Sequence, residues 1–409
     1  MQIYLVGGAV RDALLGLTVQ DRDWVVVGAS ADDLLNQGYL AVGKDFPVFL
    51  HPETHEEYAL ARTERKTGQG YTGFAVYTSP DISLEQDLLR RDLTINAMAQ
   101  DLSGSLIDPY GGQHDLQNGI LRHVSPAFTE DPVRILRTAR FAARYGFQVA
   151  PETMQLMQNM VANGEVNALV AERVWQELSK GLMEKQPARM FEVLRECGAL
   201  SILLPEIDAL FGVPQPEAHH PEIDSGIHTL MVVQRAAQMN LSLPERYAAL
   251  LHDLGKALTP KEMLPKHIGH DMAGLKPVRA VNQRWRVPKV CAELAELVCR
   301  FHIRLHQISQ IKRAQAILKL LQETDAFRRP ERFQAALNVC QADAQGRLGL
   351  NNTPYPQKQQ WLALLHAAQQ APTAEIAKQY ANQPEKIAQA ITQTRINLIQ
   401  AVLNTQKAA

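Results

Sequence analysis

The chain has little cysteine, almost no net charge and no long apolar run, and each absence excludes something. Its 409 residues contain only four cysteines, with no metal-type spacing: Cys197, Cys291, Cys299 and Cys340. We therefore expect reduced thiols in the core of a cytoplasmic protein. The formal net charge is −1, so any surface for nucleic acid must be local. No apolar run reaches the roughly 20 residues of a membrane span, and no basic and apolar leader comes first, so we expect no membrane partner.

The length predicts two or more domains, and the periodicity of the apolar residues divides them. Residues 1–125 mix strand and helix patterns between many glycines and prolines, whereas helical patterns dominate from residue 126 onward. This predicts an α+β protein in which a head with a small mixed sheet precedes an all-helical remainder. We divide the remainder into a neck and body, 126–205, a helical domain, 228–345, and a C-terminal tail, 346–409. The Pro- and His-rich segment 205–225 is the expected hinge.

The expected elements are short in the head and longer beyond it. Strand patterns lie at 3–6, 21–27, 47–50, 57–61, 94–102 and 105–107. Helix patterns lie at 9–15, 132–145, 151–161, 172–183, 188–197, 229–239, 245–254, 291–301, 311–322, 331–342 and 358–369.

The first 24 residues combine a glycine turn with two acidic side chains. Gly7–Gly8 separates a strand pattern from a helix pattern, and Asp21 and Asp23 lie on the next strand pattern. Because side chains alternate along a strand, the two carboxylates should share a face. Carboxylates suit Mg²⁺, while the bare amides of the turn and the nearby Arg11 suit phosphate oxygens. Each feature alone also fits an ordinary turn or a solvated strand edge, but their occurrence in one unit favours a joint site.

The strand pattern at 57–61 begins with Glu57, a candidate third carboxylate. If this strand lies beside the one that carries Asp21 and Asp23, Glu57 could join the metal site; the alternative is a solvated residue at a strand start. Basic residues in 62–66 then lead into a glycine-rich stretch, 67–73. Its composition predicts a mobile loop, and the positive charges suit a phosphate backbone.

Arginines gather at two further places. Arg90–Arg91 either neutralises a triphosphate or answers the dipole at the end of a helix. In the helix expected at 132–145, Asp131 fits the N-cap, Pro132 the first position and Gly146 the end. Its arginines share one stripe and should repel each other unless an anion binds there, although a solvated basic face is the alternative: Arg134, Arg137, Arg140 and Arg144. Asp131 and Arg134 also offer the acceptor and donors that reading a base edge requires.

The C-terminal half holds an ordered series of histidines and acids. His228, the adjacent pair His252–Asp253 and the distal Asp343 predict a metal site, with Lys256 as a nearby cation for phosphate. The alternative for each histidine alone is a place in an apolar core. Four more histidines lie between the last two ligand positions, with the final pair one helical turn apart: His267, His270, His302 and His306. His302 is a further candidate ligand.

Together these residues match a known family. Residues 1–200 resemble the bacterial tRNA nucleotidyltransferases, or class II CCA-adding enzymes, a class that also includes bacterial poly(A) polymerases. Residues 228 to about 343 resemble an HD-type metal phosphohydrolase domain. The motifs that carry the first resemblance are Gly7-Gly8-Ala9-Val10-Arg11-Asp12, Asp21-x-Asp23, Arg90-Arg91-Asp92-x-Thr94-x-Asn96-Ala97, Asp108-Pro109-x-Gly111-Gly112, Glu130-Asp131-x-x-Arg134-x-x-Arg137-x-x-Arg140 and Glu172-Arg173-x-x-x-Glu177.

The resemblance implies a polymerase-beta-like nucleotidyltransferase head that adds C, C and A to the 3′ end of tRNA from CTP and ATP without a template. Asp21 and Asp23 would be catalytic and hold Mg²⁺ for two-metal transfer. Phosphate contacts would come from Gly8, Arg11 and Arg91. Asp131 and Arg134 would read the base, and Arg137 and Arg140 would complete the pocket. The expected partners are the tRNA 3′ end, ATP and CTP, and the expected state is a monomer, with a homo-oligomer left open.

The HD resemblance implies a divalent transition metal, Ni²⁺ being one candidate, held by His228, His252, Asp253 and Asp343. The implied activities are 2′,3′-cyclic phosphodiesterase, 2′-nucleotidase and phosphatase. Two alternatives stay open. A poly(A) polymerase shares the head motifs but would favour a longer, strongly basic tail, whereas this chain ends in Gln-Lys-Ala-Ala. A tRNA-binding protein with an inactive head is disfavoured by the intact acidic pair.

Overall fold

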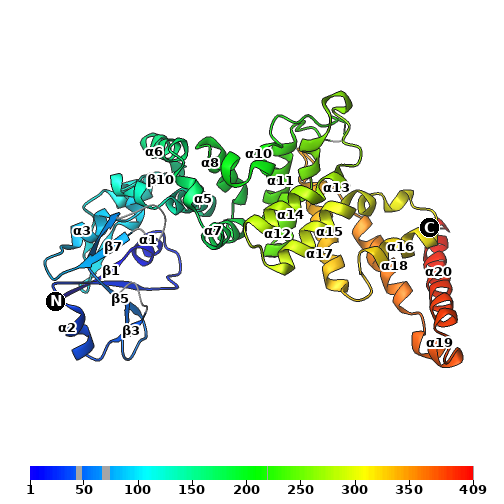
Figure 1. Ribbon diagram of the computed structural model, residues 1–409, viewed down its shortest axis with the longest axis horizontal. Helices are drawn as coiled ribbons and strands as arrows, with labels where there is room; N and C mark the ends of the chain where they lie inside the picture. The colour runs from blue at the N-terminus through cyan, green and yellow to red at the C-terminus, as the bar shows by residue number, and fades with distance from the viewer. Residues whose placement is uncertain (43–47, 67–73, 219, 409) are drawn as a thin grey trace. The chain divides into compact units, whose positions relative to one another are not determined.

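The computed structural model describes residues 1–42, 48–66, 74–218 and 220–408. The chain forms two compact units, Met1–Leu203 and Leu204–Ala409. In Figure 1 the larger sheet belongs to the first unit, and the second unit is built from helices. Among the described residues, none of the helices is both long enough and apolar enough to cross a membrane. The finer boundaries at residues 125 and 345 stay predictions.

A mixed sheet organises the head. Its described strands follow the order β3-β4-β5-β2-β1-β8-β9. The central strand β2 pairs antiparallel with β1 and parallel with β5, so Asp23 lies opposite Val6 on one side and opposite Glu57 on the other. The strands are β1 Gln2–Val6, β2 Asp23–Val27, β3 Leu40–Val42, β4 Val48–Leu50, β5 Glu57–Leu60, β8 Ala99–Asp101 and β9 Leu106–Ile107.

The alternation of side chains along β2 places an apolar cluster on each face of this sheet. Val25 packs with Leu88 of α3, Leu84–Leu89, whereas Val26 packs with Leu34 of α2, Ala31–Asn36. All four side chains are buried. Two-sided burial fixes the register of β2, because a slip by one residue would exchange its two faces. The start of the strand, and with it Asp23, is therefore held firmly.

Two strand predictions in the head need correction. The strand begins at Asp23 and not at Asp21, because its partner β1 ends at Val6 where the glycine turn leads into α1, Gly8–Leu14. The segment 94–102 is not extended throughout: it starts as a 3-10 turn, η1 Thr94–Asn96, before β8. There the Thr94 hydroxyl donates to Asp115 at 2.7 Å, which favours a tight turn over a strand.

Outside the large sheet, two small pairs of strands occur. β6 Arg62–Lys66 pairs with β7 Phe74–Thr78, and the glycine-rich stretch 67–73 lies outside the described residues. β10 Ile120–Leu121 pairs in parallel with β11 Gln148–Val149. The second of these strands lies in the region from residue 126 onward, where helical patterns alone were expected to dominate.

Helices dominate the rest of the first unit. α5 Val133–Tyr145 packs against α7 Ala171–Met183 and α8 Pro187–Glu196. The remaining helices of this unit are α4 Gly112–Asn118, α6 Pro151–Ala162, α9 Ala199–Leu203 and the short 3-10 turns η2 Pro126–Glu130 and η3 Glu165–Ala168.

The second unit is arranged around an apolar helix, α12 Leu243–Leu251. Its last five residues are all buried, and it packs against α11, α15 and α17. Because Tyr247–Leu251 are buried on every side of the helix, this part of α12 lies inside the core, and the chain that leaves it emerges within the unit. The other described helices are α10 Pro205–Asp208, α11 Ser225–Gln238, α13 His270–Ala273, α14 Leu275–Arg284, α15 Lys289–His306, α16 Ala314–Glu323, α17 Pro330–Gln345, α18 Gln357–Gln369, α19 Thr373–Gln379 and α20 Pro384–Ala408.

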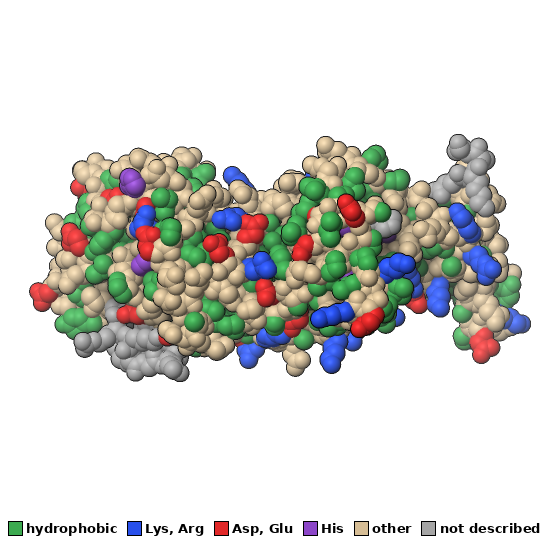
Figure 2. Space-filling view, turned by 90° about the horizontal axis from the view of Figure 1, so that it is seen from above, with side chains coloured by type: hydrophobic (Ala, Val, Ile, Leu, Met, Phe, Trp, Pro, Cys, Tyr) green, Lys and Arg blue, Asp and Glu red, His purple; other side chains and the backbone are tan. Residues whose placement is uncertain are grey.

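The cysteine prediction is confirmed: all four thiols are free and buried. On the face drawn in Figure 2, acidic and basic side chains of the described residues are interspersed.

Candidate functional site

One cavity of about 740 Å³ in the first unit is lined by candidate site residues from both the head and the neck. Its lining comes from β1, β2, β5, α5 and the segment after α3. Every residue of this half that the sequence singled out for metal or nucleotide lies on its wall: Gly8, Arg11, Asp21, Asp23, Glu57, Arg91, Asp131, Arg134, Arg137 and Arg140. Residues more than 130 positions apart in the chain therefore face the same space.

Asp21 and Asp23 form an acidic pair at the start of β2. Protein atoms around Asp23 strip part of its hydration and raise its pKa, and the neighbouring Asp21 carboxylate raises it further, while Arg91 acts in the opposite direction. Glu57 is the register partner of Asp23 on the adjacent parallel strand. The two strands therefore lie side by side, which is the condition under which Glu57 could be a third carboxylate. Neighbouring carboxylates on the wall of one cavity are a donor set that fits a hard divalent cation.

The glycine turn brings the backbone close to two arginines. Gly7 has φ +66°, and a Cβ on it would lie 2.9 Å from Nη1 of Arg91. The Arg11 side chain is buried, and its guanidinium carbon lies over the rings of Phe141 and Tyr145, at 5.1 and 5.3 Å from their centroids. Arg11 also donates to Asn96 Oδ1, so its guanidinium is oriented before any ligand arrives.

Arg90 and Arg91 lie at the end of a helix, and their role toward a triphosphate stays a prediction. Arg90 is the C-cap residue of α3, and both arginines bind the buried carboxylate of Asp87, at 2.8 and 3.1 Å. Although burial of Asp87 opposes its ionisation, the two guanidinium groups lower its pKa. Both arginines also line the cavity, so the end of this helix contributes to the wall.

The arginine stripe of α5 is not the uncompensated row that the sequence suggested. Acids from distant segments pair with its arginines: Arg137 with Asp92 at 2.7 Å, Arg140 with Glu177 at 2.6 Å, and Arg144 with Asp12 at 3.0 Å. The argument that the stripe requires an anion to relieve repulsion was therefore wrong. The stripe is instead a set of guanidinium groups held in place by partners from α1, α7 and the segment after α3.

Asp131 and Arg134 are likewise held by protein groups. The helix starts one residue later than expected, at Val133, with Pro132 in the capping position, although Asp131 Oδ1 still accepts from the Val133 amide at 3.1 Å. Arg173 grips the Asp131 carboxylate with two bonds of 2.9 and 2.7 Å. Arg134 donates to the carbonyl oxygens of Ala127 and Arg90, at 2.9 and 2.7 Å. Both side chains are thus preoriented at the cavity wall.

Three supporting residues in this half were not assigned a role from the sequence. Asp12, Asp92 and Asn96 occur in the quoted motifs, but nothing in their spacing shows what they contact. Asp92 accepts from Asn96 at 2.9 Å and from Arg137, and Asp12 accepts from Arg144 and from the Tyr145 hydroxyl at 2.8 Å. These carboxylates connect the head to α5.

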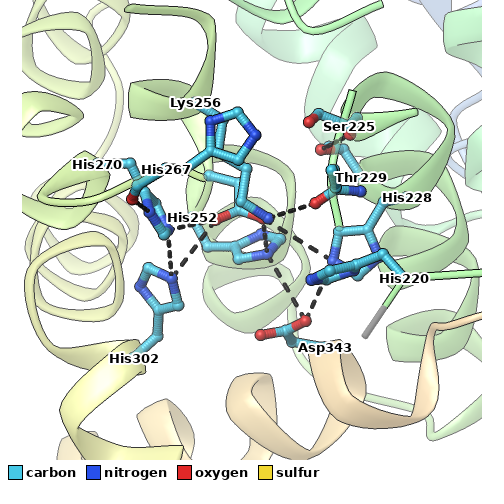
Figure 3. Close-up of polar contacts among 12 residues, drawn as sticks. His220, Ser225, His228, Thr229, His252, Lys256, His267, His270, His302 and Asp343 are labelled. Carbon is cyan, nitrogen blue, oxygen red and sulfur yellow. Dashed lines mark hydrogen bonds and ion pairs between the residues drawn. The ribbon is translucent and has the colours of Figure 1, made fainter. Parts of the chain in front are cut away.

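A second cluster lies in the other unit, where α12 ends. His228 from α11, Asp343 from α17 and the pair His252–Asp253 converge there, and all four are buried. Figure 3 shows His228, His252 and Asp343 directed toward one another. His228 Nε2 lies 3.1 Å from Asp343 Oδ1 and 3.8 Å from Asp253 Oδ2, and His252 Nε2 lies 3.1 Å from the same Asp253 oxygen. The sequence prediction that these four residues meet is confirmed.

His302 and a residue without an assigned role, His270, complete the cluster on the opposite side of Asp253. Their Nε2 atoms lie 3.4 and 3.1 Å from Asp253 Oδ1, and 3.2 Å from each other. In the described part of the chain, His228–His252–Asp253 and Asp253–His270–His302 both have the compactness of a metal-ligand group, with Asp253 common to the two. The signal for His270 was only its position between the other histidines.

The donor set fits a divalent cation. Within the described residues, His252 Nε2 and Asp253 Oδ1 are buried and make no hydrogen bond of good geometry, although charged neighbours lie within 3.4 Å. Despite burial, His252 and Lys256 hold the pKa of Asp253 well below its usual range. Lys256 Nζ lies 2.6 Å from Asp253 Oδ2. Buried carboxylate and imidazole atoms directed into one space are a common metal site.

Three family models match successive parts of the chain. Residues 3–122 match the model of the poly A polymerase head domain, and residues 146–211 match a probable RNA and SrmB-binding site of polymerase A. Residues 226–328 match the HD domain.

Two CCA-adding enzymes of known structure share the fold. One, solved in complex with ATP, is 20% identical with a TM-score of 0.65 over 97% of this chain and 86% of that chain. The other, from Bacillus stearothermophilus in complex with CTP, is 22% identical with a TM-score of 0.63 over 99% of this chain and 93% of that chain. The multifunctional CCA protein of Neisseria meningitidis serogroup A is 68% identical over 100% of this chain and 98% of the relative. The chain therefore belongs to the multifunctional CCA protein family.

Proposed function

We propose that the first unit adds C, C and A in sequence to the 3′ end of tRNA from CTP and ATP, without a nucleic-acid template. The observation that carries this proposal is the common cavity, whose wall holds the acidic pair, the glycine turn and the arginines of α5. Membership of the family supports the same assignment.

In this proposal Asp21 and Asp23 are the catalytic carboxylates that hold Mg²⁺, and Glu57 stands beside them as a third ligand. When bound, Mg²⁺ supplies charge neutralisation for the triphosphate and activation of the tRNA 3′-hydroxyl. Arg11 and Arg91 bind phosphate oxygens, and the absence of a side chain on Gly8 lets the backbone approach them. Because their partners already orient both guanidinium groups, little ordering remains when the nucleotide binds.

Base selection falls to Asp131 and Arg134 at the start of α5. A carboxylate and a guanidinium present acceptors and donors in a fixed pattern, which is the requirement for distinguishing C and A from other bases. Arg137 and Arg140 complete the nucleotide pocket, kept in place by Asp92 and Glu177. Selection without a template thus depends on protein groups whose positions are set before binding.

The test uses tRNA that lacks its 3′ CCA, with one labelled nucleotide at a time. CCA addition predicts two C residues, then one A, and then a stop. A poly(A) polymerase would instead produce an unbounded ladder of A, and a binding protein without catalytic activity would incorporate nothing.

We propose further that the HD domain hydrolyses phosphate esters as a 2′,3′-cyclic phosphodiesterase, 2′-nucleotidase and phosphatase. His228, His252, Asp253 and Asp343 would hold a divalent transition metal, with Ni²⁺ as the first candidate, and His270 and His302 would enlarge the site on the other side of Asp253. The bound metal supplies Lewis-acid polarisation of the phosphoryl group. Lys256 adds a cation for the phosphate oxygens.

The two activities suit one molecule, because a tRNA end blocked by phosphate offers no 3′-hydroxyl for nucleotide addition. Asp253→Ala should abolish ester hydrolysis and leave nucleotide addition near normal. Loss of both activities in a folded variant would contradict the model of two sites. The buried thiols support a cytoplasmic location for both reactions.

A further inference from the structure

The histidines of the two ligand groups share one orientation. Each presents Nε2 to the carboxylates at the centre of the cluster (Figure 3). For three of them, Nδ1 lies 2.6 to 3.1 Å from backbone carbonyl oxygens of the preceding turn: His252 with Ala249, His270 with His267, and His302 with Val298 and Cys299. A ring nitrogen beside a carbonyl oxygen must carry the proton, so Nε2 keeps a lone pair for a cation.

His228 is the exception. In the described part of the chain no backbone carbonyl accepts from its Nδ1. That atom lies instead 2.8 Å from Oε1 of Glu222, without the in-line geometry of a full hydrogen bond. The Glu222 side chain is only 2% exposed, and its other oxygen accepts from the Leu348 amide at 3.2 Å. The Oε1 atom also lies 3.0 Å from Nδ1 of His220. Glu222 thus contacts His220, the ligand on α11 and the segment that follows α17, the helix of Asp343.

We propose that Glu222 is the positioning residue that sets the tautomer and the donor strength of His228 as a metal ligand. This inference rests on the metal-dependent function proposed for the HD domain. A carboxylate beside Nδ1 keeps the proton on that nitrogen and makes Nε2 more basic than a carbonyl partner would. His228 is therefore the ligand whose affinity for a cation depends on a side chain and not on the backbone of its own helix.

Two other roles for Glu222 are physically distinct. It could merely anchor its segment through Leu348, in which case its loss would lower stability but not the affinity of the folded site. It could also bind a cation directly, together with His220 and His228, whose ligand atoms lie close enough together. Direct binding would require His228 Nδ1 to give up its proton, and it predicts one more cation per chain than indirect positioning.

The experiment titrates the metal-free full-length protein with Co²⁺, whose visible bands report its ligands, and compares wild type with Glu222→Ala and Glu222→Gln. We expect Co²⁺ affinity to fall about 10- to 100-fold in Glu222→Ala, the range typical of lost outer partners of metal ligands. Glu222→Gln should show a smaller fall, because an amide keeps an acceptor but not the charge. Glu217→Gln, an exposed change of the same kind in the same segment, should match wild type.

A second measurement separates positioning from anchoring. Long-range proton–nitrogen NMR spectra of the metal-free protein should show His228 protonated on Nδ1 in wild type, with a mixture of tautomers in Glu222→Ala. Unchanged Co²⁺ affinity in either variant, with nucleotide addition intact as evidence of folding, overturns the proposal. The proposal is also overturned if wild type binds two cations and a Glu222 variant loses one of them while the other binds as before. Failure of wild type itself to bind Co²⁺ would instead overturn the metal-dependent function.

Discussion

The carboxylate of Asp92 receives a 2.7 Å hydrogen bond from Nε of Arg137, 45 residues away in the chain. Asp92 is buried, and its other contacts are the Asn96 amide group and the amide of Leu93. The pair thus fixes an arginine of the proposed nucleotide pocket to a segment that is packed inside the head. A pocket that must distinguish bases needs this kind of fixed geometry.

Replacing Asp92 with asparagine should release Arg137 from its charged partner. We expect KM for both CTP and ATP to rise about tenfold, which corresponds to a loss of about 1.4 kcal/mol in binding. Steady-state kinetics on tRNA ending in CC or C would measure this. In a double-mutant cycle with Arg137→Gln, the two changes should be non-additive by about 0.5 to 3 kcal/mol. Strict additivity would show that the pair does not act as a unit.

The same carboxyl group gives a pH dependence of definite sign. Burial opposes its ionisation, but Arg137 and Asn96 outweigh burial and hold the pKa of Asp92 well below the ordinary value of 3.8. A carboxyl with a lower pKa in the folded state stabilises the fold above its unfolded pKa, and this contribution disappears as the pH falls toward the folded pKa. We expect the advantage of wild type over Asp92→Asn, of about 1 to 3 kcal/mol at pH 7, to shrink below about pH 4. Urea unfolding of both proteins at a series of pH values would measure this difference in the free energy of unfolding. A difference that grows as the pH falls would contradict a lowered pKa of Asp92 in the folded state.

Alanine at either Asp21 or Asp23 should reduce nucleotide addition to background, because Mg²⁺ would lose half of its acidic pair. Incorporation of labelled CTP into tRNA is the measurement. Asp32→Ala removes a solvent-exposed carboxylate of α2 that lies outside the cavity wall and serves as the matched control. Appreciable transfer by either site variant would remove the basis of the proposed mechanism.

Glu57→Gln tests the third carboxylate without changing the size of the side chain. As the neighbour of Asp23 across the parallel pair, Glu57 should contribute charge to the metal site, and its neutralisation should raise the Mg²⁺ concentration for half-maximal transfer about tenfold, or about 1.4 kcal/mol. The exposed Glu53→Gln is the control. An unchanged Mg²⁺ requirement would return Glu57 to the role of a solvated residue at a strand start.

Gly255→Ala should damage the HD site selectively. A Cβ at this position would collide with the carbonyl oxygen of His270 and come within 2.7 Å of the Gly274 nitrogen, so α13 must move. Overpacking of this kind destabilises a core by about 1 to 3 kcal/mol. We expect weaker Co²⁺ binding and a lower midpoint for unfolding of the second unit. Nucleotide addition by the same molecule is the internal control, and its parallel loss would point to general misfolding.

Local patterns in the sequence were sufficient for the groups that are close along the chain. The strand, glycine turn and helix around Arg11, and the apolar helix that ends at His252–Asp253, follow from periodicity and capping residues. The family resemblance supplied the roles. The long helix α20 was missed although its apolar residues recur at helical spacing, as at Ile387, Ile391, Leu398 and Val402.

Long-range partners could not be predicted in this way. The acids that neutralise the α5 stripe are 37 to 132 residues away from their arginines, and no local spacing records such pairs. The exact start of β2 also depended on another segment, since β1 stops pairing at the glycine turn. Glu222 is a similar case: its significance lies in the ring nitrogen that it faces, which only the folded chain reveals.

Helices α11, α15 and α17, which supply His228, His302 and Asp343, all pack on the buried α12, and His228 and Asp343 are 115 residues apart. A cation held there would tie distant turns of the chain together in the manner of a covalent bridge. Its free energy of binding would then add to the free energy of folding. Removal of the cation by a chelator would accordingly lower the stability of the second unit as well as abolish the proposed hydrolysis. The rate at which proteases cleave this unit would then depend on the metal concentration.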